Sequence, residues 1–163
     1  MIVAIARARL KAILVQLANI GEVFETRRKP LVSVRILIVD DHDVVREGVR
    51  SILKKRSDWE ICGEASNGQE ALAQTESLKP DVIILDITMP QMSGLDVARR
   101  ITQTTPDSRV VMFTMHDSGT VEQAVKGSGA HGLVLKLNAA RDLVKAVDVV
   151  VGGGTFFSSA VSA

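Results

Sequence analysis

Four short, continuous apolar segments recur in the last four-fifths of the chain, and they constrain its fold more than any other feature. They are Ile36–Val39, Val82–Leu85, Val110–Phe113 and Leu133–Leu135. Continuous rather than alternating apolar runs are typical of parallel strands that are buried on both faces of a sheet. A weaker run at Trp59–Cys62 alternates between apolar and polar residues, which predicts an edge strand.

Helical patterns separate these predicted strands. Each pattern begins with a polar residue that favours a helix N-terminus and continues with apolar side chains at helical spacing. The start residues are Asp43, Asn67, Ser93, Ser118 and Asn138. Glu70, three residues after Asn67, favours a capping box, and Gly127 and Gly152 are predicted stops. Five strands alternating with five helices predict an α/β fold, a doubly wound open parallel sheet with helices on both faces.

The chain has 163 residues, enough for one such domain with an appendage and too few for a multidomain enzyme. Its formal charge of +1 hides an asymmetry, because residues 1–33 carry six basic and two acidic side chains. That segment is therefore +4, and residues 34–163 are −3. We predict an N-terminal extension at 1–33, a globular domain at 34–152 and a C-terminal tail or truncated linker at 153–163.

Composition places the chain among ordinary globular proteins. Hydrophobic residues make up 46% of the sequence, and no apolar run reaches the roughly 18 residues of a membrane span. The single cysteine, Cys62, cannot form an internal disulfide, which predicts a reducing, cytoplasmic location. Residues 1–33 have apolar side chains at roughly helical spacing, so they are interpreted either as an interaction helix or as an artefact of a start site placed upstream of Val34.

Polar residues capable of chemistry follow the predicted strands. Asp40 and Asp41 follow the first run, Asp86 the second, Thr114 the third and Lys136 the fourth. Each has an ordinary alternative, such as a turn or a solvated surface charge. In an open parallel sheet, however, the carboxyl ends of the strands meet at one edge, where ligands bind. We therefore expect three carboxylates, a hydroxyl and an ammonium group at that edge.

Such a cluster favours a cation. Two carboxylates about 4 Å apart repel each other by roughly 4 kcal/mol at an effective dielectric constant of 20. Lys136 supplies one counter-charge, and the remaining hard oxygen donors suit Mg²⁺. His42, His116 and His131 are scattered, which argues against zinc. A carboxylate beside Mg²⁺, a lysine and a hydroxyl can act as a nucleophile toward a phosphoryl group.

Several segments that carry these residues resemble one known family. Val39-Asp40-Asp41-His42, Leu85-Asp86-Ile87-Thr88-Met89-Pro90 with Gly94, Phe113-Thr114-Met115-His116 and Gly129 through Lys136 are similar to the response-regulator receiver (CheY-like) domains, in particular to their NarL/FixJ branch. The resemblance covers residues 34–163 with the motifs in family order. It implies a flavodoxin-like sheet with strand order 2-1-3-4-5 and a phosphorylation-dependent switch of a two-component system.

The resemblance also implies roles for individual residues. Asp86 would accept a phosphoryl group from a sensor histidine kinase, and Thr114 and Lys136 would contact that group. Asp41, Asp86 and the backbone carbonyl of Thr88 would bind Mg²⁺, with Asp40 bound through water. A protein of this kind is not an enzyme beyond catalysing its own phosphorylation and dephosphorylation.

Three departures from the family pattern concern signalling and output. Leu133 stands where the family usually has an aromatic residue, which puts aromatic-flip signalling in doubt, and Leu137 stands where proline is common. The usual helix-turn-helix domain is missing before Ala163, so we predict a regulator's receiver part without sequence-specific DNA binding. Phosphorylation is expected to favour a homodimer through the helix after Ser118, the strand at 133–135 and the helix after Asn138, whose face carries Val144, Val147 and Val151.

Two other classes compete with this interpretation. A haloacid-dehalogenase-type phosphatase also places a nucleophilic aspartate at a strand end with a threonine two residues on, as in Asp86 and Thr88. That class normally has a second aspartate where this chain has Thr88, and it needs a larger core. A flavin-binding, flavodoxin-like carrier would need a glycine-rich phosphate loop after the first strand, where Asp40 and Asp41 would repel phosphate.

Overall fold

A computed structural model describes residues 33–158 of the chain. The predicted helix at 1–33 therefore lies outside the described residues, apart from Ser33. In chain order the elements are β1 (Val34–Val39), α2 (Asp43–Leu53), β2 (Trp59–Ala65), α3 (Gly68–Leu78), β3 (Val82–Asp86), α4 (Gly94–Thr104), β4 (Arg109–Thr114), α5 (Gly119–Gly127), β5 (Gly132–Leu135), the 3₁₀ turn η1 (Lys136–Asn138), α6 (Ala139–Val151) and β6 (Phe156–Phe157).

The strands between residues 33 and 158 all belong to one parallel sheet with the order β2-β1-β3-β4-β5-β6. The doubly wound topology is confirmed, and β2 lies at an edge as its alternating pattern predicts. The sheet has one strand more than the five predicted. Phe156 pairs with Gly132 and Phe157 with Leu133, so part of the predicted tail extends the sheet beyond β5. A strand of two residues shows no periodicity from which it could be predicted.

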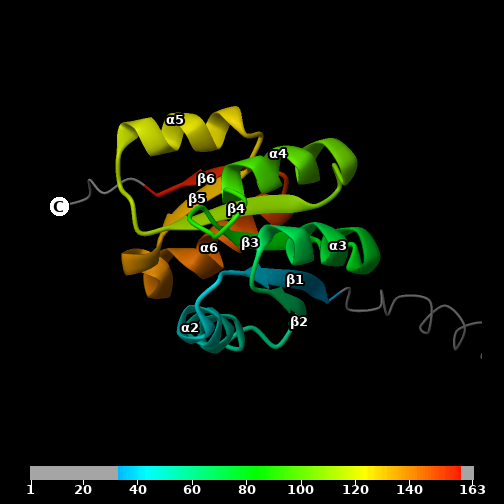
Figure 1. The fold of residues 1–163 in the computed structure, drawn as a ribbon. Helices are drawn as coiled ribbons and strands as arrows, with labels where there is room; N and C mark the ends of the chain where they lie inside the picture. The colour runs from blue at the N-terminus through cyan, green and yellow to red at the C-terminus, as the bar shows by residue number, and fades with distance from the viewer. Residues whose placement is uncertain (1–32, 159–163) are drawn as a thin grey trace, which may run out of the picture. The chain divides into compact units, whose positions relative to one another are not determined.

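Two helical layers sandwich the sheet, with α3, α4 and α5 on one face and α2 and α6 on the other (Figure 1). Alternate residues of each central strand point into opposite layers. Leu37 and Leu85 join the cluster under α3, α4 and α5, whereas Ile36 and Ile84 join the cluster over α2 and α6. All four are at most 1% exposed. The continuous apolar runs therefore arise because both faces of these strands are covered.

Helix starts agree with the predicted signals at three positions. The side chains of Asn67, Ser93 and Ser118 each accept a hydrogen bond from a backbone N–H in the first turn of α3, α4 and α5. At α2 the N-cap is His42, and Asp43 is the first helical residue. Asn138 precedes α6, but its side chain makes no capping hydrogen bond.

A close approach between α4 and the end of β3 fixes the loop that follows Asp86. The backbone N–H of Gly94 donates to the carbonyl oxygen of Ile87 at 2.8 Å. A Cβ atom at Gly94 would lie only 1.9 Å from the carbonyl oxygen of Asp86. Glycine is therefore required here, because any side chain would push the helix away from the strand end that carries Asp86.

The longest helix between residues 33 and 158 has 13 residues, short of the roughly 20 needed to cross a bilayer.

Candidate functional site

The strand ends at the carboxyl edge of the sheet bring two aspartates and a lysine into direct contact. Asp40 directly follows β1, Asp86 ends the adjacent strand β3, and Lys136 directly follows β5. The Lys136 Nζ lies 2.6 Å from Asp40 Oδ2 and 3.1 Å from Asp86 Oδ1. Asp40 and Asp86 are only 1% and 3% exposed. One ammonium group thus bridges two buried carboxylates from the middle of the sheet.

Burial and charge act in opposite directions on the ionisation of this cluster. Burial raises the pKa of Asp86, although the charge and hydrogen bond of Lys136 oppose that shift. Burial lowers the pKa of Lys136, but its hydrogen bond to Asp40 and its contacts with Asp86 outweigh burial, and the net shift of the pKa is upward. Lys136 is therefore held protonated, and its Nζ also lies 5.7 Å from the centroid of the Phe113 ring.

Asp41 supplies an acceptor without a hydrogen-bond partner. Its Oδ1 atom is buried and accepts no hydrogen bond from any described residue. The Nδ1 atom of His42 lies 3.0 Å from this oxygen and 3.1 Å from Asp40 Oδ1, but only the contact with Asp40 has hydrogen-bond geometry. Because unsatisfied buried oxygens are rare in folded proteins, this atom indicates a missing partner.

The donor set fits a hard divalent cation. Asp40, Asp41 and His42 place one ligand atom each within 4.8 Å of one another. Asp86 is joined to this group through Lys136, so the edge offers three carboxylates, the oxygen donors that Mg²⁺ prefers. The His42 side chain is 66% exposed, and it borders this acidic pocket from the solvent side.

The remaining predicted site residues lie beside this pocket. Thr114 ends β4, the neighbour of β3, and is 1% exposed. Its Oγ1 accepts a hydrogen bond from the backbone N–H of His116 at 3.1 Å. Thr88 is exposed, and a backbone hydrogen bond from Thr88 to the Asp86 carboxylate partly offsets the upward shift of that group's pKa. Leu133 is buried among the residues under α3, α4 and α5.

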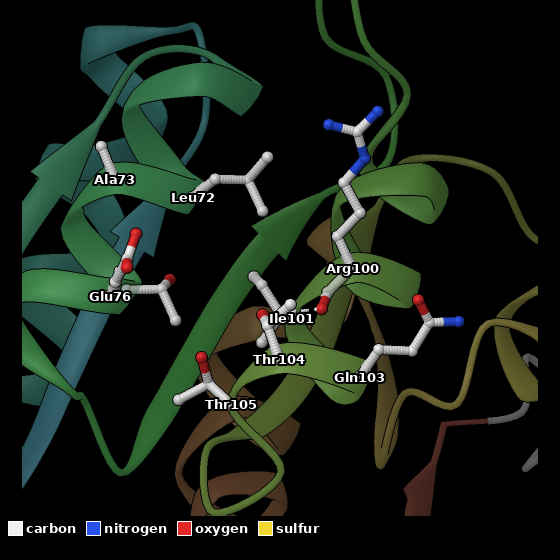
Figure 2. A pocket seen from close by; sticks show the side chains of 9 residues that line it. Leu72, Ala73, Glu76, Arg100, Ile101, Gln103, Thr104 and Thr105 are labelled. Atoms are coloured by element: carbon white, nitrogen blue, oxygen red, sulfur yellow. Dashed lines mark hydrogen bonds between the residues drawn. The ribbon is translucent and has the colours of Figure 1, made fainter.

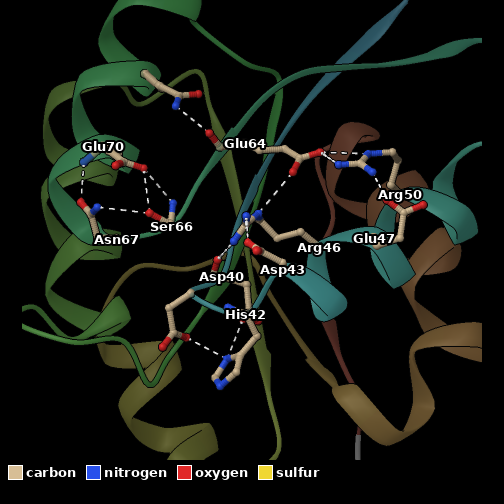
Figure 3. Close-up of polar contacts among 12 residues, drawn as sticks. Asp40, His42, Asp43, Arg46, Glu47, Arg50, Glu64, Ser66, Asn67 and Glu70 are labelled. Carbon is tan, nitrogen blue, oxygen red and sulfur yellow. Dashed lines mark hydrogen bonds and ion pairs between the residues drawn. The ribbon is translucent and has the colours of Figure 1, made fainter.

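One contact at this edge was not anticipated from the sequence. Arg46, on α2, donates from Nη1 to the backbone carbonyl oxygen of Asp40 at 2.6 Å and from Nε to Glu64 Oε2 at 3.2 Å (Figure 3). Arg46 follows Asp43 by three residues, a spacing at which side chains meet on a helix, and the two do form an ion pair. The contact with Asp40 depends on the turn between strand and helix and has no such pattern.

A groove of about 500 Å³ lies away from this cluster, between the C-terminal halves of α3 and α4 (Figure 2). Leu72 and Ile101 face it from the two helices, with Glu76 and Arg100 at its margins. None of the carboxylates at the carboxyl edge lines it. This groove and the concentrated chemistry are thus in different places.

Together, the doubly wound sheet and the bridged acidic pocket at its carboxyl edge define a CheY-like receiver domain. A model of the response regulator receiver domain matches residues 36–148. The chain therefore belongs to the response-regulator receiver family. This membership supports the signalling interpretation rather than the phosphatase alternative.

Relatives and solved structures agree with this assignment. The transcriptional regulatory protein MctR of Rhizobium johnstonii is 36% identical over 129 residues, which are 79% of this chain and 60% of MctR. A LuxR-family response regulator from Aurantimonas superposes with a TM-score of 0.72 at 32% identity, covering 75% of this chain and 87% of that one. The receiver domain of NarL from Mycobacterium tuberculosis gives 0.71 at 34% identity, with 74% and 98% covered. The chain spans 55–60% of the length of the first curated relatives it matches, which are transcriptional regulators.

Proposed function

We propose that this receiver domain accepts a phosphoryl group on Asp86 from a phosphorylated histidine of a sensor kinase, in the presence of Mg²⁺. The observation that carries the proposal is the bridge from Lys136 to both Asp40 and Asp86, at 2.6 and 3.1 Å. Burying two carboxylates around one ammonium group costs folding free energy. A need to bind a charged ligand at this edge would explain why the protein buries them there.

Asp40, Asp41 and Asp86 would hold the metal ion, together with the backbone carbonyl of Thr88. Bound Mg²⁺ neutralises charge that develops on the phosphoryl oxygens. The unpartnered Oδ1 of Asp41 supports this assignment, because a cation would satisfy it. The raised pKa of Asp86 reflects burial away from water, a cost that a nearby cation would offset.

In the transfer step, a carboxylate oxygen of Asp86 attacks phosphorus while the bond from phosphorus to the kinase imidazole nitrogen breaks. The electron pair of that bond returns to the imidazole, and the product is an aspartyl phosphate. The ammonium group of Lys136 would then pair with the new phosphoryl oxygens instead of with the Asp86 carboxylate. The hydroxyl of Thr114, which now accepts from the N–H of His116, would turn to donate to the phosphoryl group.

Movement of Thr114 and Lys136 would alter the surface formed by α5, α6 and the edge of the sheet at β5 and β6, and we propose that it favours a homodimer there. Val149 and Val151 of α6 support this site, because they are 38% and 45% exposed. Val147, which the sequence suggested for this face, is fully buried and belongs to the core. Light scattering with beryllofluoride and Mg²⁺ should show a doubled mass, and an unchanged mass would remove the dimer but not the local switch.

We also propose that residues 1–163 do not discriminate between DNA sequences. The net charge of −3 over residues 34–163 supports this, since duplex binding needs a basic surface. Titration of labelled duplexes at about 150 mM salt tests it. A difference in binding free energy above about 1.4 kcal/mol between two sequences, a tenfold ratio of affinities, would contradict it.

Phosphorylation by acetyl phosphate tests the central proposal. With Mg²⁺ the chain should gain one phosphoryl group, located by peptide mapping to Asp86, and Asp86→Asn should gain none. Asp96→Asn is the matched control, because Asp96 is an exposed carboxylate on α4. Labelling of Asp86→Asn to the wild-type level would show that the acceptor is elsewhere.

A further inference from the structure

The side chain of Arg46 spans the turn between β1 and α2 that carries the acidic pocket. Its Nη1 donates to the carbonyl oxygen of Asp40 at 2.6 Å, and its Nη2 contacts Asp43 in the first turn of α2 (Figure 3). Its Nε donates to Glu64 of β2 at 3.2 Å. The side chain is only 15% exposed. One guanidinium group therefore joins the end of β1, the start of α2 and the edge strand β2.

Other hydrogen bonds also hold this turn: the N–H of Asp40 donates to the carbonyl oxygen of Ala65, and the N–H groups of Val45 and Arg46 donate to the carbonyl oxygen of His42. His42, the N-cap of α2, makes no side-chain capping hydrogen bond, although its backbone N–H donates to Asp40 Oδ1 at 2.9 Å. The peptide group between Asp40 and Asp41 is the one whose oxygen Arg46 holds. The orientation of that peptide helps to set the direction in which the Asp41 side chain leaves the backbone, and so limits where its unpartnered Oδ1 can lie.

We propose that Arg46 is a positioning residue for the metal site, acting through the Asp40 carbonyl to aim the carboxylate of Asp41. This inference rests on the proposed function, because it assumes that the pocket binds Mg²⁺. Mg²⁺ demands near-ideal octahedral geometry, so a small rotation of the peptide weakens its binding. Partners that orient metal ligands without touching the metal typically change its affinity by 10- to 100-fold.

Arg50 provides a matched control one helical turn further on. It also lies on α2 and also donates to Glu64, from Nε to Oε1 at 2.9 Å. Its other partner is Glu47, and it makes no contact with Asp40. Substitution of either arginine removes one positive charge and one ion pair with Glu64. Only substitution of Arg46 releases the peptide that precedes Asp41.

The sign of the effect separates positioning from simple electrostatics. Removing a positive charge near a cation site removes a Coulomb repulsion, which by itself strengthens cation binding. A charge effect therefore predicts tighter Mg²⁺ binding in Arg46→Gln, and a smaller tightening in Arg50→Gln. Loss of positioning predicts weaker binding in Arg46→Gln only. Arg46→Lys keeps the charge and can donate one hydrogen bond, so its affinity should fall between wild type and Arg46→Gln.

The experiment is calorimetric titration of the full chain with Mg²⁺, with urea unfolding of each variant in the absence of metal as a measure of folding. We expect Arg46→Gln to bind Mg²⁺ at least tenfold more weakly than wild type, and Arg50→Gln to stay within about twofold. Should Arg46→Gln fail to fold, Arg46→Lys decides, with a several-fold loss expected.

Equal affinities in wild type, Arg46→Gln and Arg46→Lys, or equal losses in Arg46→Gln and Arg50→Gln, would overturn the positioning role while leaving the proposed function intact. Absence of Mg²⁺ binding by the wild-type chain would overturn the proposed function and this inference with it. Weaker Mg²⁺ binding by Arg46→Gln, together with unchanged Mg²⁺ binding by Arg50→Gln, supports both the proposed function and the positioning role of Arg46.

Discussion

The two faces of the sheet and its carboxyl edge follow opposite physical rules. On the faces, side chains such as Ile36 and Leu37 are fully buried among other apolar groups, and each such burial stabilises the fold by about 1.5–3 kcal/mol. At the carboxyl edge, Asp40 and Asp86 are buried almost as completely, although burying a charge costs several kcal/mol before pairing. The faces therefore stabilise the fold, whereas the edge costs stability, which agrees with the proposed binding of charged groups there.

The largest effect should come from the faces. Ile84, 1% exposed in the centre of β3, packs between the sheet and the layer of α2 and α6. Ile84→Ala should lower the free energy of unfolding by about 4 kcal/mol through lost burial and a cavity. Val44→Ala, at a side chain that is 84% exposed, should change it by less than about 0.5 kcal/mol. Urea unfolding measures both, and similar losses would contradict the assignment of the core.

A smaller loss is expected when the lysine at the edge is removed. Lys136→Met should destabilise the metal-free protein by about 3 kcal/mol at neutral pH, because it leaves Asp40 and Asp86 buried without their shared partner. The loss should shrink at acidic pH, where the carboxylates become protonated. Lys126→Met is the control, since Lys126 pairs with Glu122 on the exposed surface of α5 and contributes little. Equal losses of unfolding free energy in the two variants would mean that the buried bridge contributes no more to stability than an exposed ion pair.

The smallest effect tests whether the edge costs stability. Since burial raises the pKa of Asp86, the folded state disfavours its ionised form at every pH above the ordinary carboxyl pKa. Asp86→Asn should therefore raise the free energy of unfolding of the metal-free protein at neutral pH, by less than Lys136→Met lowers it. Below the ordinary carboxyl pKa both states are protonated and the gain should vanish. A destabilised Asp86→Asn at neutral pH would show that pairing outweighs burial.

Most of the fold could be predicted from the sequence because its patterns arise from burial. The runs at Ile36–Val39 and Val82–Leu85 are apolar throughout, since both faces of those strands are covered. Strand β6 could not be predicted, because two phenylalanines near a chain end have no period. The burial of Val147 was also missed, since helical spacing alone does not decide which of several valines on α6 faces the sheet.

The part of the candidate site that the sheet topology brings together could be predicted from the sequence. Asp40, Asp86 and Lys136 meet because parallel strands bring their carboxyl ends to one edge, whatever the local sequence. Arg46 was not predictable, because its contact with the Asp40 carbonyl depends on the path of a turn rather than on spacing. The acceptor role of Thr114 toward His116 likewise depends on loop geometry.

The most direct test of the contrast between faces and edge is urea unfolding of the full chain with Mg²⁺ alone, beryllofluoride alone and both together. If the edge with its buried charges is a site for a cation and a phosphoryl group, the combination should stabilise wild type by about 2.7 kcal/mol at a hundredfold excess over the dissociation constant. Asp86→Asn should gain nothing from beryllofluoride. Equal stabilisation of wild type and Asp86→Asn by the combination, or none in wild type, would contradict the account.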